Sequence, residues 1–172
     1  MGMDVFGKNP ANKVGEYFRR NVWGWRPLWD YVMEQHPELG ELVKHGYSND
    51  GDGLNKQNSL LLAKKLEDDL QTGSAQKYIQ ARNERLASLP LEDCKYCEAT
   101  GVRSDEVGVE NGMPDRELRE EQRIVLGRDK GWCNGCDGVG QVQSFFCSYY
   151  LDTEDIEEFA QFLKACGGFE IC

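Results

Sequence analysis

Two cysteine pairs of the form Cys-x-x-Cys constrain this chain more than any other feature. The first knuckle spans 94–101 and the second spans 133–140, and each ends in a glycine four residues past its second cysteine. A two-residue spacer lets both sulfurs of a pair reach one ion, and four thiolates are the number that a closed tetrahedral zinc site needs. We therefore predict one structural Zn²⁺, with four ligands: Cys94, Cys97, Cys133 and Cys136.

Two other chemistries for these cysteines fit the sequence less well. A thioredoxin-like Cys-x-x-Cys begins a helix after a buried strand, and neither pair is predicted to do so. A nucleophilic thiol needs a nearby base, and no histidine follows His45. The remaining cysteines, Cys147, Cys166 and Cys172, lack the paired spacing.

The second knuckle resembles a known zinc-binding repeat. Cys133-Asn-Gly-Cys-Asp-Gly-Val-Gly140 is similar to one Cys-x-x-Cys-x-Gly-x-Gly repeat of the zinc domain of DnaJ-type chaperones. In the first knuckle, Ala99 replaces the first glycine of that repeat. Those chaperones carry four repeats and two zinc ions, and their His-Pro-Asp signature is missing from this chain. The resemblance implies a metal and a local hairpin shape, not chaperone activity.

A second resemblance covers most of the chain but implies no activity. Four segments are similar to a family of small proteins from bacteria and their phages: Gly15-Glu-Tyr-Phe18, Trp25-Arg-Pro-Leu-Trp-Asp-Tyr31, Gly131-Trp-Cys-Asn-Gly-Cys-Asp-Gly138 and Ala165-Cys-Gly-Gly-Phe169.

The net charge of −10 is unevenly distributed. Residues 1–90 hold 12 Lys+Arg and 12 Asp+Glu, whereas residues 91–172 hold 8 and 18. Four thiolates around one Zn²⁺ add about −2 more. This distribution predicts that the C-terminal half repels nucleic acid and attracts a protein partner with a basic surface. The alternative is an acidic face that only keeps the chain soluble.

Two segments are candidates for partner binding. A charged helix is predicted over 114–123, and its acidic residues have few apolar neighbours: Asp115, Glu117, Glu120 and Glu121. The aromatic stretch around Trp25, Arg26 and Trp29 is the second candidate, with a helix predicted over 27–35. These rings suit a hydrophobic core, but aromatic residues interleaved with arginines also suit a protein contact or nucleic-acid bases.

The pattern of the whole chain predicts an α+β fold with a mainly helical N-terminal body, a loop-rich hairpin region stapled by zinc, and a C-terminal helix. We divide it into a helical body over 1–90, a zinc module with an inserted loop and short helix over 91–145, and a strand, helix and tail over 146–172 that pack on the body. Further predictions are an ordered arm over 4–11, helices over 12–21 and 38–45, and a helical hairpin over 58–89. Strands are predicted over 124–126 and 141–150, a helix from about 152 to 166, and a terminal strand or tail over 169–171.

Three classes of function are compatible with these features. The first is a non-enzymatic zinc-binding module that binds another protein, because a four-cysteine zinc has no open position for water. The second is a phage-encoded inhibitor of a nucleic-acid-binding defence complex of bacteria, of the anti-CRISPR type, whose acidic surface mimics a phosphate backbone. The third is a small enzyme with structural zinc, for which His45, Asp50 and Asp52 are the available cluster.

The sequence also predicts a compartment. No apolar run approaches the roughly 18 residues of a membrane span, and no signal peptide opens the chain. Seven cysteines without a secretory signal indicate a reducing environment. We therefore expect a cytoplasmic protein without membrane contact, in the bacterial host cytoplasm if a phage encodes it.

Overall fold

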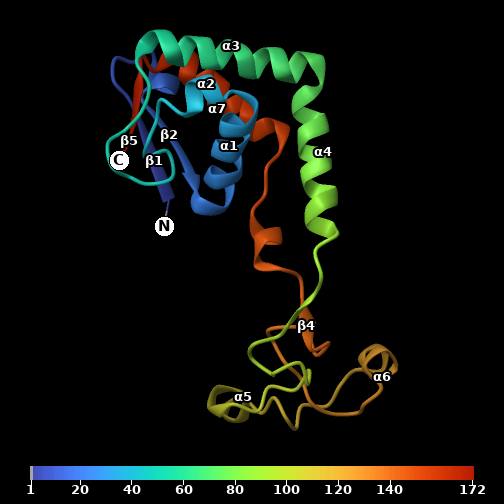
Figure 1. The fold of residues 1–172 in the computed structure, drawn as a ribbon. Coiled ribbons are helices and arrows are strands. Elements are labelled where there is room, and N and C mark those ends of the chain that lie inside the picture. The colour runs from blue at the N-terminus through green and yellow to red at the C-terminus, as the bar shows by residue number, and fades with distance from the viewer. Residues whose placement is uncertain (1) are drawn as a thin grey trace. The chain divides into compact units, whose positions relative to one another are not determined.

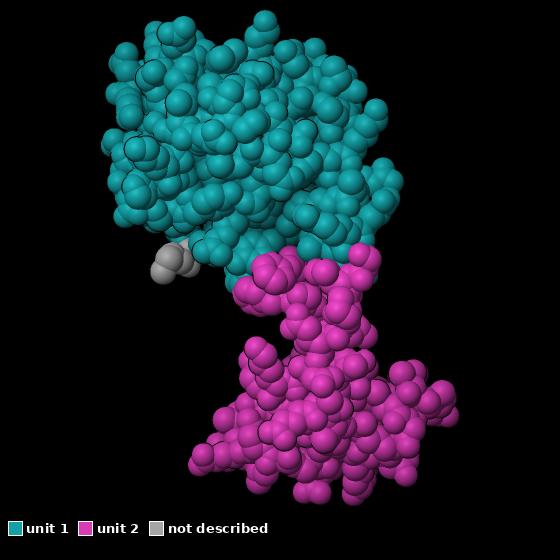
Figure 2. Space-filling model, in the orientation of Figure 1, with its two compact units in different colours: residues 1–87, 148–172 teal, residues 88–147 magenta. Residues whose placement is uncertain are grey.

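The computed structural model describes residues 2–172, which form two compact units (Figures 1 and 2). The first unit combines residues 2–87 with residues 148–172, and the second contains residues 88–147. The second unit is thus an insertion between two parts of the first, and the predicted zinc segment 91–145 lies inside it. The predicted α+β class is confirmed. None of the helices within residues 2–172 is long and apolar enough to span a membrane.

The first unit contains a three-stranded antiparallel sheet of order β2-β1-β5. Its strands are β1 (Gly2–Gly7), β2 (Tyr17–Asn21) and β5 (Phe169–Ile171), and a short 3-10 helix η1 (Lys13–Gly15) connects the first two. Val5 pairs with Phe18 on one side and with Ile171 on the other, and all three side chains are buried. The predicted terminal strand 169–171 is therefore confirmed.

The sheet overturns the sequence-based prediction for the N-terminus. The helix expected over 12–21 is wrong, and the arm expected over 4–11 begins as strand β1. The alternating pattern that marks a strand covers only a few residues of β1, because Met3 and Val5 are its only large buried side chains. The strand depends on pairing with β5, which is more than a hundred residues away in the sequence.

Five helices complete the first unit. They are α1 (Val22–Gln35), α2 (Pro37–Gly40), α3 (Lys56–Thr72), α4 (Ser74–Ala87) and α7 (Thr153–Ala165). Helix α1 begins five residues before the predicted start, because the Asn21 side chain accepts a hydrogen bond from the Gly24 N–H at 3.0 Å and caps it. Asp152 caps α7 in the same way through the Asp155 N–H, as the acidic start of that helix predicted.

The core of the first unit lies between α1, α3, α7 and the sheet. Leu62 and Leu66 of α3 are completely buried, as predicted, and α7 lies alongside α3 (Figure 1). The rings of Trp25 and Trp29 are stacked with centroids 5.6 Å apart, and Phe159 of α7 meets Trp25 edge-on at the same distance. Burying large aromatic rings in this geometry contributes about 0.5–1.5 kcal/mol per pair beyond the area buried.

Helix α4 does not fold back along α3 to make the predicted hairpin (Figure 1). Ala75 in its first turn is its one buried residue, while Ile79 and Leu86 are half-buried. The predicted apolar stripe of α4 is interrupted by charged residues, so the stripe is too weak to hold the helix against α3 along its length.

The second unit contains little regular structure. Its elements are β3 (Glu92–Asp93), α5 (Glu106–Glu110), α6 (Glu120–Leu126), β4 (Gln141–Val142) and η2 (Phe145–Ser148), the last residue of which begins the return to the first unit. Strands β3 and β4 pair antiparallel, directly before the first knuckle and directly after the second.

Three predicted elements of the second unit are wrong over all or most of their length. The helix expected over 114–123 is a turn followed by extended chain, in which Leu118 donates to the Asp129 carbonyl at 2.9 Å and is 2% exposed. Burial of this single leucine favours the extended conformation, so the helix starts only at Glu120. The strand expected over 124–126 is the end of α6, and the strand expected over 141–150 ends at Val142.

Candidate metal centre

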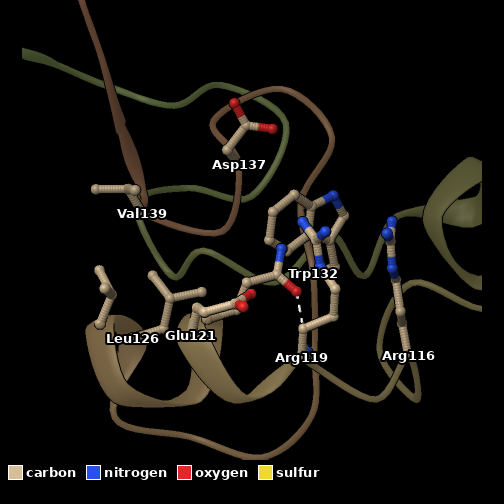
Figure 3. A pocket seen from close by; sticks show the side chains of 9 residues that line it. Arg116, Arg119, Glu121, Leu126, Trp132, Asp137 and Val139 are labelled. Atoms are coloured by element: carbon tan, nitrogen blue, oxygen red, sulfur yellow. Dashed lines mark hydrogen bonds between the residues drawn. The ribbon is translucent and has the colours of Figure 1, made fainter.

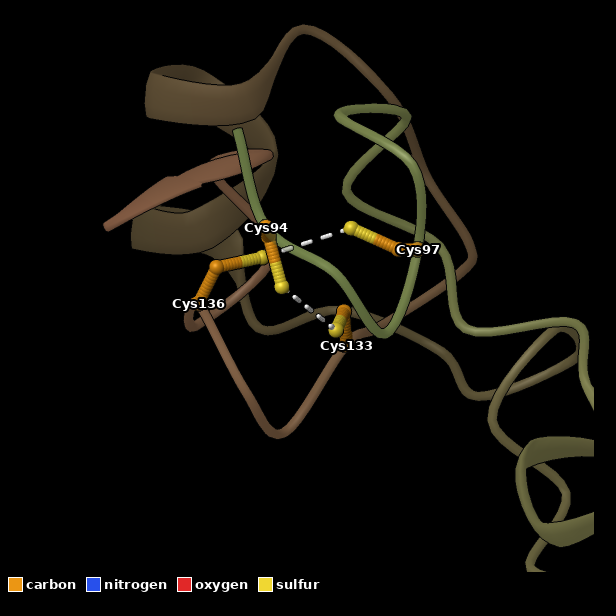
Figure 4. Close-up of side chains that lie close together, drawn as sticks. All are labelled: Cys94, Cys97, Cys133 and Cys136. Atoms are coloured by element: carbon orange, nitrogen blue, oxygen red, sulfur yellow. Dashed lines mark hydrogen bonds between the residues drawn. The ribbon is translucent and has the colours of Figure 1, made fainter. Parts of the chain in front are cut away.

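The two knuckles bring all four predicted cysteines together. Their sulfur atoms lie within 4.8 Å of one another, and all four residues are buried (Figure 4). The Sγ atoms of Cys94 and Cys133 are 3.8 Å apart, and those of Cys97 and Cys136 are 3.7 Å apart. Sulfurs at the corners of a tetrahedron with metal–sulfur distances of about 2.3 Å are separated by about 3.8 Å. These four thiols can therefore bind a metal ion.

The backbone of the second knuckle repeats that of the first. The Cys94 carbonyl accepts hydrogen bonds from the N–H groups of Cys97 and Ala99, both at 3.4 Å. The Cys133 carbonyl accepts from Cys136 at 3.4 Å and from Gly138 at 3.1 Å. The same turn in both places directs each pair of sulfurs to one point, which explains why two separate stretches of chain build one site.

Backbone donors also reach the sulfur atoms. The Gly101 N–H donates to the Cys97 Sγ, and the Gly140 N–H donates to the Cys136 Sγ, both at 3.2 Å. The Cys94 N–H donates to the Gly140 carbonyl at 2.9 Å, which links the two knuckles. Hydrogen bonds of this kind hold sulfur ligands in place and stabilise their negative charge.

The glycines that end the knuckles are required by close packing. A Cβ atom at Gly101 would collide with the Gly138 carbonyl, and one at Gly140 would collide with the Ala99 carbonyl. Each glycine thus makes room for the opposite knuckle. Ala99 and Gly138 are equivalent positions with φ of 65° and 80°, so Ala99 holds a left-handed conformation that glycine adopts more readily.

Arg128 connects the two knuckles from outside the motif. Its Nη2 atom donates to the Gly101 carbonyl at 2.9 Å and to the Gly138 carbonyl at 2.6 Å. No sequence pattern distinguishes this residue, because one arginine in a loop has no characteristic spacing. Only the fold brings it to both carbonyls.

Burial opposes ionisation of the clustered thiols. It raises the pKa of the Cys133 thiol to about 12, and it also raises the pKa of Cys97. At Cys94 burial is again the largest influence, but hydrogen bonds from the Tyr96 N–H and the other thiols outweigh it and lower the pKa. Four adjacent thiolates repel one another, so a metal ion is the group that allows all four to ionise together.

The metal centre is also the main interior of the second unit. Among the large apolar side chains and cysteines of residues 88–147, only Leu118 and the four cysteines are buried, and Val142 packs against the sulfurs. So small a core cannot offset the entropy of ordering the segment. A metal ion bound by these cysteines would therefore contribute to the folding free energy of this unit.

The aromatic candidates for partner binding, Trp25 and Trp29, belong to helix α1 of the first unit and are buried. Trp25 and Trp29 are both 0% exposed, and the Trp25 indole N–H donates to the Gly46 carbonyl at 2.7 Å. The interpretation of these rings as core is confirmed, and their use as contact residues is wrong because no face of either ring reaches solvent. Arg26 is exposed and donates to the Tyr149 hydroxyl at 3.2 Å.

The four acidic candidates are exposed but do not share one helix. Asp115 lies in a turn, Glu117 bridges to Lys130 with a 3.7 Å ion pair, and Glu120 and Glu121 form the first turn of α6. Residues 88–147 hold 7 Lys+Arg and 12 Asp+Glu, and the rest of the chain holds 13 and 18, so each unit carries −5. The acidic half of the sequence is therefore divided between two units.

In the cluster of His45, Asp50 and Asp52, the Asp52 carboxylate stabilises the loop that contains it. Asp52 accepts hydrogen bonds from the backbone N–H groups of His45 at 3.0 Å and Gly53 at 2.8 Å, which closes the loop. The His45 Nδ1 atom is 3.9 Å from an Asp50 oxygen. Across residues 2–172, the four cysteines form the one group of His, Cys, Asp or Glu side chains arranged to hold a metal ion.

Comparison of the chain with protein-family models, curated proteins and solved structures finds no match. The resemblances to the DnaJ-type zinc repeat and to small bacterial and phage proteins stay predictions.

Proposed function

We propose that residues 88–147 form a zinc-stabilised module through which this chain binds another protein. The observation that carries the proposal is the closed set of four buried sulfurs with separations of 3.7 and 3.8 Å. Thiolate ligands select zinc or iron over magnesium and calcium, and zinc is the usual ion of two Cys-x-x-Cys turns. Four sulfur ligands leave no position for a reacting water, so the role of the ion is structural and not catalytic.

The surface of the module supports a binding role. Nine large apolar side chains of this unit are exposed: Leu91, Tyr96, Val107, Val109, Ile124, Val125, Val139, Phe145 and Phe146. Exposed apolar surface of this kind, surrounded by charged residues, marks protein-interaction sites. The net charge of −5, made more negative by a zinc–thiolate centre, favours a partner with a basic surface.

Metal analysis of the purified protein tests the first part of the proposal. We expect one zinc per chain, and Cys136→Ser should abolish it and disorder residues 88–147. The matched control is Cys147→Ser, which changes a half-buried cysteine of the same unit outside the cluster. Near-stoichiometric iron, or no metal at all, would refute the zinc assignment.

Capture from a bacterial lysate tests the second part. We expect the zinc-loaded protein to retain a protein that the Cys136→Ser variant does not retain. Association should slow as salt rises, because exposed charges are screened beyond about 8 Å at physiological ionic strength. Retention that is identical for both proteins would place the binding surface outside the module.

A further inference from the structure

The second unit contains an open pocket of about 460 Å³ between α6 and the second knuckle (Figure 3). Its apolar lining comes from Val125, Leu126, Trp132 and Val139. Charged and polar side chains complete the lining: Arg116, Arg119, Glu121, Gln122 and Asp137. Sites that hold ligands or large side chains have volumes of about 300–1,000 Å³ and a mainly apolar lining with a few polar groups.

The metal centre fixes one wall of this pocket. Trp132 directly precedes the ligand Cys133, while Asp137 and Val139 lie inside the second knuckle. Helix α6 packs closely on the same turn, because a Cβ atom at Gly138 would lie 2.9 Å from the Leu126 Cδ1 atom and 3.2 Å from the Trp132 Cε3 atom. The pocket therefore depends on the knuckle being formed.

The apolar side chains at the pocket are left open to solvent. Val125 is 78% exposed and Val139 is 59% exposed. The guanidinium of Arg116 lies over the Trp132 ring at 4.9 Å from its centroid, which fixes the indole as a wall of the pocket. A rigid aromatic wall beside exposed valines is suited to receive an apolar side chain from outside.

The charges around the pocket indicate the sign of its occupant. Among the charged residues that line it, Arg116 and Arg119 balance Glu121 and Asp137. The residues next to the lining in the sequence add three carboxylates against Arg123: Asp115, Glu117 and Glu120. Glu117 pairs with Lys130, but within residues 2–172 the other four carboxylates have no ion pair. This local excess of negative charge favours a positively charged occupant and disfavours nucleic acid or a second copy of a chain with net charge −10.

We infer that the pocket between α6 and the second knuckle is the docking site for a basic segment of another protein, which inserts one aromatic side chain against Trp132, Val125 and Val139. This inference deepens the proposed function and rests on it. The lysines and arginines that flank the inserted ring would meet the unpaired carboxylates at the edge of the pocket, as a hydrophobic anchor surrounded by charge pairs.

A titration of the full-length, zinc-loaded protein followed by NMR tests the inference. Three synthetic peptides of equal length serve as probes: a Lys/Arg-rich peptide with a central tryptophan, the same peptide with a central alanine, and a Glu-rich peptide with a central tryptophan. We expect the first alone to shift the indole N–H resonance of Trp132 and the methyl resonances of Val125, Leu126 and Val139. Equal binding of the alanine peptide, or no binding of the first peptide, would overturn the inference.

Two neighbouring residues provide a matched pair of variants. Val125→Asn should weaken binding of the first peptide by about tenfold or more, because it places an uncharged polar group in the apolar lining without altering the net charge. Ile124→Asn should leave binding unchanged, because Ile124 is equally exposed, at 77% against 78% for Val125, but does not line the pocket. Equal losses in both variants would overturn the inference.

Competing occupants give separate results. Shifts of the same resonances on adding a single-stranded oligonucleotide, or on concentrating the protein alone, would assign the pocket to nucleic acid or to self-association and overturn the inference. Metal content measured on each variant separates this failure from that of the proposed function. Full zinc without peptide binding refutes the docking site only, whereas absence of zinc refutes the proposed function.

Discussion

Replacing Ala99 with glycine should tighten metal binding. Ala99 has a φ of 65°, and the equivalent residue of the second knuckle is Gly138 with a φ of 80°. A left-handed conformation costs a residue with a Cβ atom about 1–2 kcal/mol. Glycine avoids that cost but loses about 0.5–1 kcal/mol more conformational entropy on folding than alanine. The net gain from Ala99→Gly is therefore about 0.5–1 kcal/mol, or roughly two- to fivefold in the metal dissociation constant.

Competition with a chromophoric chelator measures this change directly. The gain is realised on metal binding, because the metal-free segment has too small a core to hold the turn in advance. Gly138→Ala is the reverse substitution and should weaken metal binding. The alanine would have to adopt a left-handed backbone conformation, and its Cβ atom would lie 2.9 Å from the Leu126 side chain.

Two results would refute this reasoning. Unchanged affinity in Ala99→Gly would show that the first knuckle is already held in the left-handed turn without metal. Weaker affinity in that variant, with Gly138→Ala unaffected, would show that backbone conformation at these positions does not control metal binding.

Three further predictions concern the two units separately. Arg128→Ala should weaken metal retention by about 2 kcal/mol, or roughly thirtyfold, because it removes a charged donor from two carbonyl groups. The rate at which a chelator removes the metal checks this prediction, and Arg123→Ala, which changes an exposed arginine of the same unit, is the control. Zinc binding at pH 7 should release protons from the cysteines, because the metal-free segment lacks a core of its own and its exposed thiols, with pKa values of about 8.5, are protonated there; calorimetry in two buffers of different ionisation enthalpy detects this, and affinity should fall as pH is lowered. Trp29→Ala should destabilise the first unit by about 3–5 kcal/mol in a thermal melt while leaving metal content unchanged; a small loss would contradict the core position of this ring.

The sequence predicted the metal site well because its geometry is local. Each knuckle directs two sulfurs through hydrogen bonds between residues three to five positions apart, and two copies of one turn need only be placed together. The helices α3 and α7 were predictable for a related reason, since Leu62, Leu66, Ile156 and Phe159 repeat with helical spacing and all are buried.

The residues that depend on long-range contacts were beyond sequence reasoning. Strand β1 exists because Val5 pairs with both Phe18 and Ile171, and the apparent helix over 114–123 gives way to extended chain because Leu118 is buried. Arg128 and Trp132 become important only when the turns and α6 are assembled around them.

By itself, therefore, the sequence determined the four clustered cysteines, the main helices and the total charge, all of which depend on composition or on spacing within one segment. Only the tertiary structure decided that the chain's two ends share one sheet and that the acidic half is divided between two units. It also decided that the tryptophans Trp25 and Trp29 are interior and that an open pocket lies beside the second knuckle. These features arise from contacts between segments far apart in the chain, whose free energies local patterns do not encode.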